Sequence, residues 1–140
     1  MKCVVDASFA GAWFLPDEHS EASQIIFETY EAGKLIFAAP ALLAYELPSM
    51  FLMALRRKRL NEHQLDEALD VFNQCKFEWH NQTDRVARSR IVDFARRNQI
   101  TGYDAAYLEL AHRLRIPLLT NDHKLAAAAG NEQVATALSK

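Results

Sequence analysis

Short apolar runs and longer amphipathic segments alternate along this chain. Four short runs have the composition of strands: KCVV, LIFAAP, FEWH and PLLTND. The segments between them repeat apolar residues at helical spacing: SFAGAWFL, SEASQIIFETYEAG, ALLAYELPSMFLMALRRKRL, EHQLDEALDVFNQC, the basic stretch 84–98, YDAAYLELAHRLR and HKLAAAA. The alternation predicts an α/β fold with a parallel sheet that helices cover on both faces. In such sheets, functional groups gather beyond the carboxyl ends of the strands.

Individual residues also mark where several elements begin and end. Ser20 and Asn61 are expected helix N-caps, and Gly33 is expected to end the helix that Ser20 begins. Pro48 lies inside an otherwise helical segment and predicts a kink or a junction between two turns. The C-terminal EQVATALSK has the pattern of a weak strand only.

Composition and charge are those of a globular protein. Of the 140 residues, 50% are hydrophobic and 24% are charged, which predicts one domain over residues 1–140. The net charge of −2 does not by itself indicate a nucleic-acid-binding protein. Eleven of the sixteen Lys and Arg residues, however, lie within Arg56–Arg59 and Arg85–Arg115. This uneven spread allows a basic face on a nearly neutral protein.

The cysteines and the lengths of the apolar runs indicate the compartment. Cys3 and Cys75 lie far apart without metal-ligand spacing, so we expect both to be reduced core thiols. The first strand ends at Asp6 and is too short for a signal peptide. LIFAAPALLAY, the longest apolar run, is about half the length of a membrane span. We therefore expect a cytoplasmic protein with no membrane segment.

Four acidic residues lie in unusual surroundings. Asp6 and Asp122 each follow an apolar strand, whereas Glu46 and Asp104 lie on helices among apolar neighbours. Each Asp stands just before a helix, where it would also serve as an N-cap. Glu46 is expected in the middle of a helix, where capping does not explain it. Taken singly, the aspartates therefore have a structural explanation as well as a functional one.

Taken together, the four acids predict a cation site. The carboxyl ends of neighbouring strands share one edge of a sheet, so the acids are expected to converge there. Two carboxylates about 4 Å apart repel by roughly 4 kcal/mol at an effective dielectric near 20. Oxygen ligands without His or Cys select Mg²⁺ or Mn²⁺, which activate water and stabilise the leaving oxygen of a phosphodiester. The acids therefore point to a metal-dependent nuclease.

The sequence resembles a PIN-domain ribonuclease, and within that family a VapC-like toxin of a toxin–antitoxin pair. The resemblance rests on VVDASFAGAWFLPDEHSEAS, PALLAYELPSMF with RRKRL, ITGYDAAYLELAHRLRIPLLTND, and HKLAAAA, which cover most of the chain. It implies a three-layer α/β/α domain with a parallel sheet of about five strands. It also implies Mg²⁺- or Mn²⁺-dependent endonucleolytic cleavage of RNA such as tRNA or another structured RNA, homodimerisation, and inhibition by a cognate antitoxin.

The resemblance assigns roles to individual residues. The acidic site falls on four residues: Asp6, Glu46, Asp104 and Asp122. The first three are expected to bind an ion, and Asp122 to complete the site through water or a second ion. Ser8 and Thr120 are expected to orient carboxylates, although both are also common cap or turn residues. The family often has Asn three positions after the second acid, where this chain has Ser49.

The basic and aromatic residues have competing interpretations. A dense basic group, expected to follow an RNA backbone, consists of Arg85, Arg88, Arg96 and Arg97. The RRKR run at 56–59 is more simply a solvated helix end. The aromatic side chains expected in the core, or on a dimer or antitoxin surface, are Trp13, Phe14, Phe51 and Phe72.

Three rival functions can be weighed against the same residues. A phosphorelay receiver domain also places acids and Mg²⁺ at strand ends, but it needs a Lys at the end of a late strand, and PLLTND has none. A haloacid-dehalogenase-type phosphatase needs a second Asp at the position of Ser8. A catalytically silent PIN-fold module would be marked by the loss of an acid, and all four are present.

Overall fold

The sheet has a central first strand. The computed structural model describes residues 1–137 and contains five parallel strands within them. The strands are β1 (Lys2–Val5), β2 (Ile36–Pro40), β3 (Glu78–His80), β4 (Leu118–Leu119) and β5 (Thr136–Ala137). Their order is β3-β2-β1-β4-β5, so the direction of the connections reverses between β1 and β4. The predicted parallel sheet of about five strands is confirmed.

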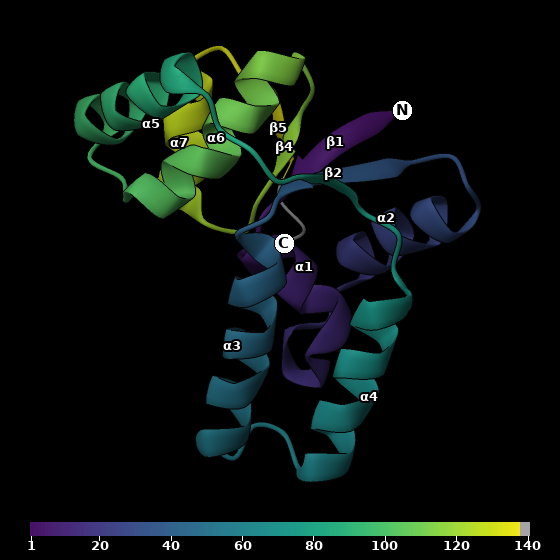
Figure 1. Cartoon of the computed structure of the whole chain (residues 1–140). Coiled ribbons are helices and arrows are strands. Elements are labelled where there is room, and N and C mark those ends of the chain that lie inside the picture. The colour runs from purple at the N-terminus through teal and green to yellow at the C-terminus, as the bar shows by residue number, and fades with distance from the viewer. Residues whose placement is uncertain (138–140) are drawn as a thin grey trace.

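Helices cover both faces of this sheet. They are α1 (Ala7–Phe14), the short 3₁₀ helix η1 (Pro16–Glu18), α2 (Glu21–Glu31), α3 (Leu43–Arg56), α4 (Glu62–Gln74), α5 (Arg85–Asn98), α6 (Gly102–Leu114) and α7 (His123–Asn131). Right-handed crossovers in this strand order place α1–α4 on one face and α5–α7 on the other, and Figure 1 shows these two groups on opposite sides of the strands. The predicted three-layer arrangement is therefore confirmed. Within the described chain, every helix is too short or too polar to cross a membrane.

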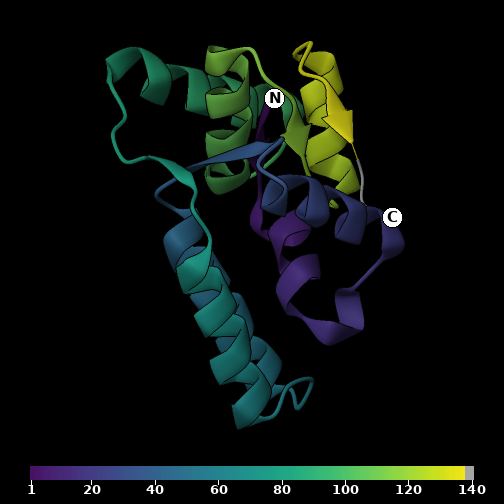
Figure 2. The ribbon, with the colours of Figure 1, turned by 90° about the vertical axis from the view of Figure 1, so that its right-hand side faces the viewer.

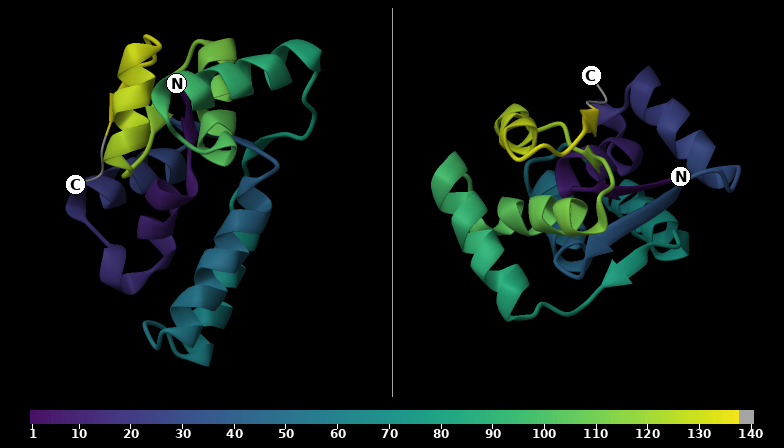
Figure 3. Two further views of the ribbon diagram at one scale, coloured as in Figure 1. Left: turned by 90° about the vertical axis from the view of Figure 1, so that its left-hand side faces the viewer. Right: turned by 90° about the horizontal axis from the view of Figure 1, so that it is seen from above.

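The central strand is buried because it has neighbours on every side. In β1, Val4 and Val5 have no exposed surface. The parallel register pairs Val5 with Leu119 of β4, and the Asp6 N–H donates to the Leu119 carbonyl at 3.2 Å. Pairing thus continues one residue beyond the strand, and it brings Asp6 beside Thr120. Figure 3 shows α6 alongside the strands with α5 on its outer side.

An aromatic core fixes α1, the helix that begins at Asp6. The Phe14 ring lies 5.6 Å from Phe51 and 5.8 Å from Phe72, and all three side chains are buried. Trp13 stacks on Phe37 at 4.7 Å. The four aromatic residues expected in the core or on a binding surface therefore belong to the core, with Trp13 only partly buried.

Close packing and one ion-pair cluster hold α3 and α4 in place. A Cβ on Gly11 of α1 would lie 2.6 Å from the Met50 sulfur of α3, so a larger residue there would require the Met50 side chain to move. Figure 2 shows α3 and α4 as a pair that extends beyond the sheet. Arg59, which follows α3, binds Asp17 and Glu18 of η1.

Several predicted element ends need correction. Pro48 predicts a kink or a junction between two turns, and the structure contains one continuous helix through it, so the junction is absent. Within EQVATALSK only Thr136–Ala137 form a strand, and residues 138–140 lie outside the part that the structure describes.

Other predictions from single residues are confirmed. Ser20 caps α2 as predicted, and Gly33 follows its end with a positive φ of 75°. Both cysteines are free, Cys3 buried and Cys75 half-buried.

Candidate functional site

Asp6 is the most buried of the four predicted acids. It follows β1 directly, and 4% of its surface is exposed. Its Oδ1 accepts hydrogen bonds from the Ser8 hydroxyl at 2.8 Å and from the Phe9 N–H at 2.9 Å. Its Oδ2 accepts one from the Thr120 hydroxyl at 2.5 Å. Three neutral donors therefore fix this carboxylate, and by accepting the Phe9 N–H, Asp6 caps α1 as the sequence predicted.

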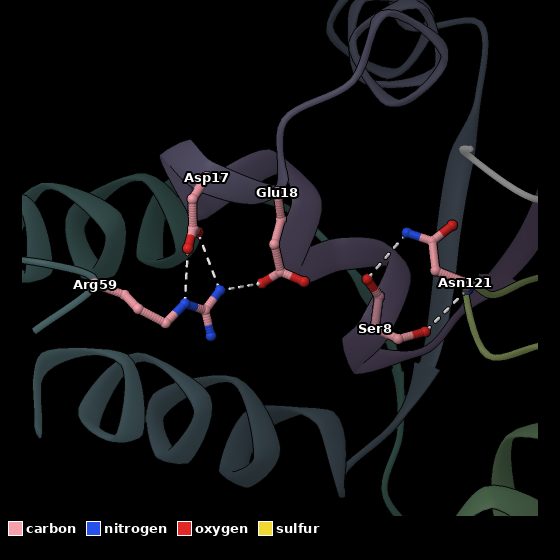
Figure 4. A network of polar contacts seen from close by, with 5 residues as sticks. All are labelled: Ser8, Asp17, Glu18, Arg59 and Asn121. Atoms are coloured by element: carbon pink, nitrogen blue, oxygen red, sulfur yellow. Dashed lines mark hydrogen bonds and ion pairs between the residues drawn. The ribbon is translucent and has the colours of Figure 1, made fainter. Parts of the chain in front are cut away.

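The two hydroxyl groups on Asp6 are themselves held by the segment after β4. The Asn121 N–H donates to the Ser8 hydroxyl at 2.9 Å, and the Asn121 side-chain amide donates to the Ser8 carbonyl at 3.2 Å (Figure 4). The Asp122 N–H donates to the Thr120 hydroxyl at 3.0 Å. Each hydroxyl therefore accepts a backbone N–H from this segment while it donates its own hydrogen to Asp6. Asn121 was not singled out from the sequence, although it directly follows Thr120.

Asp104 and Asp122 lie at the starts of two helices on the same face of the sheet. Thr101, not Asp104, is the N-cap of α6, and its hydroxyl accepts the Asp104 N–H at 3.0 Å. The expectation that Asp104 caps the helix is wrong, because α6 begins at Gly102 and Asp104 lies within its first turn. Asp122 is the N-cap of α7 and accepts the N–H groups of Lys124 and Leu125 at 2.9 and 3.2 Å.

Glu46 lies in the first turn of α3, not in the middle of the helix as expected. Its carboxylate accepts a short hydrogen bond from the hydroxyl of Tyr107 on α6. Tyr107 is 1% exposed. A hollow of about 490 Å³ opens beside Glu46, lined by Ala7 and by the α3 residues Tyr45, Ser49, Met50 and Met53. Ser49, where the family often has Asn, is thus an exposed residue of this hollow.

The pKa shifts link the four acids electrostatically. The pKa of Asp6 is raised to about 6 in total. Burial is the largest cause, the charge of Asp104 adds to it, and the hydrogen-bond donors act in the opposite direction. Burial also raises the pKa of Glu46, and again the charge of Asp104 adds to the effect. Burial raises the pKa of Asp104 itself, and the charge of Asp122 raises it further. Asp104 therefore lies within electrostatic reach of the other three acids, as convergence at one edge requires.

The residues of this acid site, Asp6, Glu46, Asp104 and Asp122, suit a divalent cation in donor type and charge. All their side-chain ligands are oxygens, which Mg²⁺ and Mn²⁺ prefer. None of the four forms an ion pair with a cationic side chain in residues 1–137, and Lys124 lowers the pKa of Asp104 only as its smallest influence. Within the same residues, no three His, Cys, Asp or Glu side chains are grouped closely enough to hold one ion together. The oxygen ligands of the acid site therefore fit Mg²⁺ or Mn²⁺, although the four side chains do not lie close enough together to surround one ion.

The predicted basic residues all lie on α5, where their surroundings differ. Arg97 forms an ion pair with Glu132 at 2.8 Å. Arg88 donates to the Thr83 carbonyl at 2.8 Å. A groove of about 460 Å³ follows the helix, lined by Arg85, Val86, Ser89, Arg90, Asp93, Phe94 and Arg97. Arg90 was not singled out from the sequence, although it lies one helical turn from Val86 and Phe94.

Comparison with known proteins identifies the family. A family model described as PIN domain matches residues 3–131. Ribonuclease VapC3 from Pyrobaculum aerophilum is 33% identical over 131 residues, which cover 90% of this chain and 93% of that protein. VapBC2 from Rickettsia felis, in a crystal structure bound to a promoter DNA fragment, shares the fold with a TM-score of 0.69, at 15% identity over 99% of this chain and 98% of that one.

A second crystal structure, of FitAcB from Neisseria gonorrhoeae, has a TM-score of 0.66 at 14% identity and covers 96% of this chain and 95% of that one. Likeness at this level of identity concerns the fold alone. The family model and the VapC3 relative both extend over nearly all of the chain. The chain therefore belongs to the PIN-domain family, in the group of ribonucleases named VapC.

Proposed function

We propose that this chain is a metal-dependent endoribonuclease and the toxin of a toxin–antitoxin pair. The observation that carries the proposal is the acid site, in which four carboxylates from separate segments are electrostatically linked without a paired cation. Carboxyl groups with raised pKa values, such as Asp6, Glu46 and Asp104, are typical of functional sites. The similar protein VapC3 is named a ribonuclease. Membership of the PIN-domain family decides against the receiver alternative.

In this proposal, Asp6, Glu46 and Asp104 hold Mg²⁺ or Mn²⁺, and Asp122 completes the site. Such an ion would activate water and offset the charge that develops on the phosphate oxygens during hydrolysis. Ser8 and Thr120 would orient the Asp6 carboxylate through the hydrogen bonds described above. The high pKa of Asp6 means that a bound cation would also favour its ionised form.

The substrate would be a structured RNA such as tRNA, guided by the basic face of α5. Arg85 is exposed, and Arg88 and Arg96 have only weak or backbone contacts, so these side chains remain available to phosphates. Arg97 also belongs to the predicted RNA-binding set, but its ion pair with Glu132 must open before it contacts RNA. Phosphate contacts of this kind would make RNA affinity fall steeply with salt.

The partners would be a cognate antitoxin and a second copy of the chain. The related solved structure from Rickettsia felis is a VapBC2 assembly on promoter DNA, which supports an antitoxin partner here. An antitoxin segment that covers the acid site would need a cationic side chain, because the site has none of its own within residues 1–137. Homodimerisation follows from the family resemblance.

The direct test is RNA cleavage by the purified chain, free of any partner. Structured RNA is incubated with Mg²⁺, Mn²⁺ or EDTA and with four proteins: the parent, Asp6→Asn, Asp104→Asn and the control Asp70→Asn. Asp70 is an exposed residue of α4. We expect cleavage that requires the ion and falls at least about 100-fold in the first two variants, about 2.7 kcal/mol of activation free energy. Asp70→Asn should cleave like the parent.

Three results would contradict the proposal in different ways. Cleavage in EDTA would exclude metal dependence. Equal activity of Asp6→Asn and the parent would exclude the acid site as the catalytic site. A folded chain that binds RNA but cleaves none would favour a catalytically silent module.

A further inference from the structure

The hydroxyl of Tyr107 on α6 donates a hydrogen bond to Oε1 of Glu46 on α3. The two residues are 61 positions apart in the sequence. Tyr107 is 1% exposed and belongs to the hydrophobic core, whereas Glu46 is only partly buried. The tyrosine is therefore the fixed partner, and the longer and more exposed glutamate is the side chain that the contact restrains.

The acids of the site differ in the donors that their carboxylates accept. Asp6 has two hydroxyls and a backbone N–H, and Asp122 has two backbone N–H groups. The Thr101 hydroxyl accepts the backbone N–H of Asp104 and lowers the pKa of its carboxyl. For Glu46, the Tyr107 hydroxyl is the one donor that residues 1–137 supply. Glu46 also has more rotatable bonds than the aspartates, so it loses the most orientation if its donor is removed.

We propose that Tyr107 is a positioning residue that holds Glu46 toward Asp104 for cation binding. The proposal rests on the proposed function and deepens it. Asp104 and Tyr107 are three residues apart on α6, so they lie on the same face of that helix. One helix face therefore supplies both a ligand and the group that orients a ligand from α3. Because the site does not have three acids grouped closely within residues 1–137, the direction of Glu46 decides how readily it closes on an ion.

A core role alone does not account for this hydroxyl. A phenylalanine would fill the same volume with no polar group to satisfy, whereas a buried tyrosine needs a hydrogen-bond partner. The partner here is a carboxylate of the acid site and not a backbone carbonyl. Tyr107→Phe removes that single hydrogen bond and keeps the ring, so it separates the positioning role from packing.

The test is direct measurement of Mn²⁺ binding by calorimetry, independent of catalysis. We compare the parent with Tyr107→Phe and with the control Tyr103→Phe, which makes the same chemical change at a 69% exposed position of α6. Loss of a group that orients a metal ligand typically weakens metal affinity by about 10- to 100-fold. We expect a loss of that size for Tyr107→Phe and less than about twofold for Tyr103→Phe.

Two further measurements separate positioning from a general loss of structure. In Glu46→Gln, adding Tyr107→Phe should weaken Mn²⁺ affinity by less than about threefold, because the two residues act through one contact. RNA cleavage by Tyr107→Phe should recover at saturating Mn²⁺, whereas cleavage by Glu46→Gln should not. A merely structural tyrosine would give additive losses of affinity and no recovery with Mn²⁺.

The possible results distinguish this inference from the function on which it rests. If the parent binds Mn²⁺ and cleaves RNA while Tyr107→Phe keeps the parent's affinity, the inference is wrong and the proposed function stands. If the losses in the double variant are additive, the inference is also wrong. If the folded parent neither binds Mn²⁺ nor cleaves RNA, the proposed function fails, and the positioning role fails with it.

Discussion

Two groups of acidic side chains in this molecule are compensated in opposite ways. Asp17 and Glu18 accept hydrogen bonds from the Arg59 guanidinium at 2.7 and 3.0 Å (Figure 4). These hydrogen bonds lower the pKa of Asp17. Asp6 is more deeply buried but is held by neutral donors only, and burial raises its pKa to about 6.

The difference shows where the chain depends on something outside itself. The Arg59 cluster is complete within one chain, and it joins the segment between α3 and α4 to η1. The acid site has the larger electrostatic cost and no cationic partner among the described residues. An uncompensated group of buried and half-buried acids is costly to keep in a fold of marginal stability. Its presence favours a function that supplies the missing positive charge.

The largest effect should appear in the pH dependence of stability without metal. Between about pH 4 and pH 6, the folded chain keeps a proton on Asp6 that the unfolded chain has lost. The free energy of unfolding should therefore fall as pH rises through this range, by about 3 kcal/mol from Asp6. Urea unfolding in EDTA at several pH values measures this slope.

Matched variants identify the source of that slope. Asp6→Asn should remove most of it, and the raised pKa values of Glu46 and Asp104 should leave a smaller slope of the same sign. Asp70→Asn should keep the slope of the parent. A parent whose stability is constant over this range would contradict the burial cost assigned to Asp6.

Divalent cations should stabilise the folded chain by supplying the positive charge that the acid site lacks. At a Mn²⁺ concentration of about 100 times Kd, binding to the folded state alone stabilises by about 2.7 kcal/mol. Thermal unfolding at pH 7 should therefore show a higher Tm with Mn²⁺ than with EDTA. Asp6→Asn should show little of this rise, and Arg59→Met should show all of it. An equal rise in Asp6→Asn would place the ion elsewhere.

Removing a neutral donor from Asp6 should have an intermediate effect. Thr120 is fully buried, and Thr120→Val keeps its shape but removes the 2.5 Å hydrogen bond to Asp6. We expect a loss of about 1–3 kcal/mol in urea unfolding at pH 7. The pKa of Asp6 should rise further, because this hydrogen bond lowers it. Thr120→Ser retains the hydroxyl and should restore most of the stability; its failure to do so would assign the loss to packing.

The smallest effect should come from breaking the exposed cluster. Arg59→Met removes the hydrogen bonds to Asp17 and Glu18 but keeps most of the aliphatic side chain. Exposed ion pairs contribute little, so we expect a loss below about 1 kcal/mol in urea unfolding. The difference from the parent should shrink in 1 M salt, where the screening length is about 3 Å. A loss above about 2 kcal/mol would make this cluster as important as the buried site.

Local patterns predicted the strands and two of the acids well. Asp6 and Asp122 could be placed from the sequence because each directly follows an apolar strand and caps the next helix. Ser8 and Thr120 were indicated by the family resemblance and not by a local pattern, and both donate to Asp6. Helix starts were less certain, since Thr101 competes with Asp104 for the N-cap of α6.

Contacts between distant segments could not be predicted in the same way. Tyr107 is visible on the same helix face as Asp104, but nothing local indicates that its partner is Glu46. Arg97 reads as a free basic residue, yet Glu132 binds it from the end of α7. Both contacts depend on how helices pack in space, which periodicity along one helix does not determine.

The groups that hold the Asp6 carboxylate are synthesised at very different times, because Ser8 and Phe9 follow it directly and Thr120 lies far along the chain. Asp6 is made 114 positions before Thr120, which supplies its shortest hydrogen bond. The strand on that side of β1 is β4, which follows β2 and β3 in the sequence and therefore leaves the ribosome after them. Asp104 and Asp122 also follow Asp6 by about a hundred residues or more. The proposed nuclease would therefore remain incomplete, and unable to cut, until the segment that contains β4 and Asp122 has emerged.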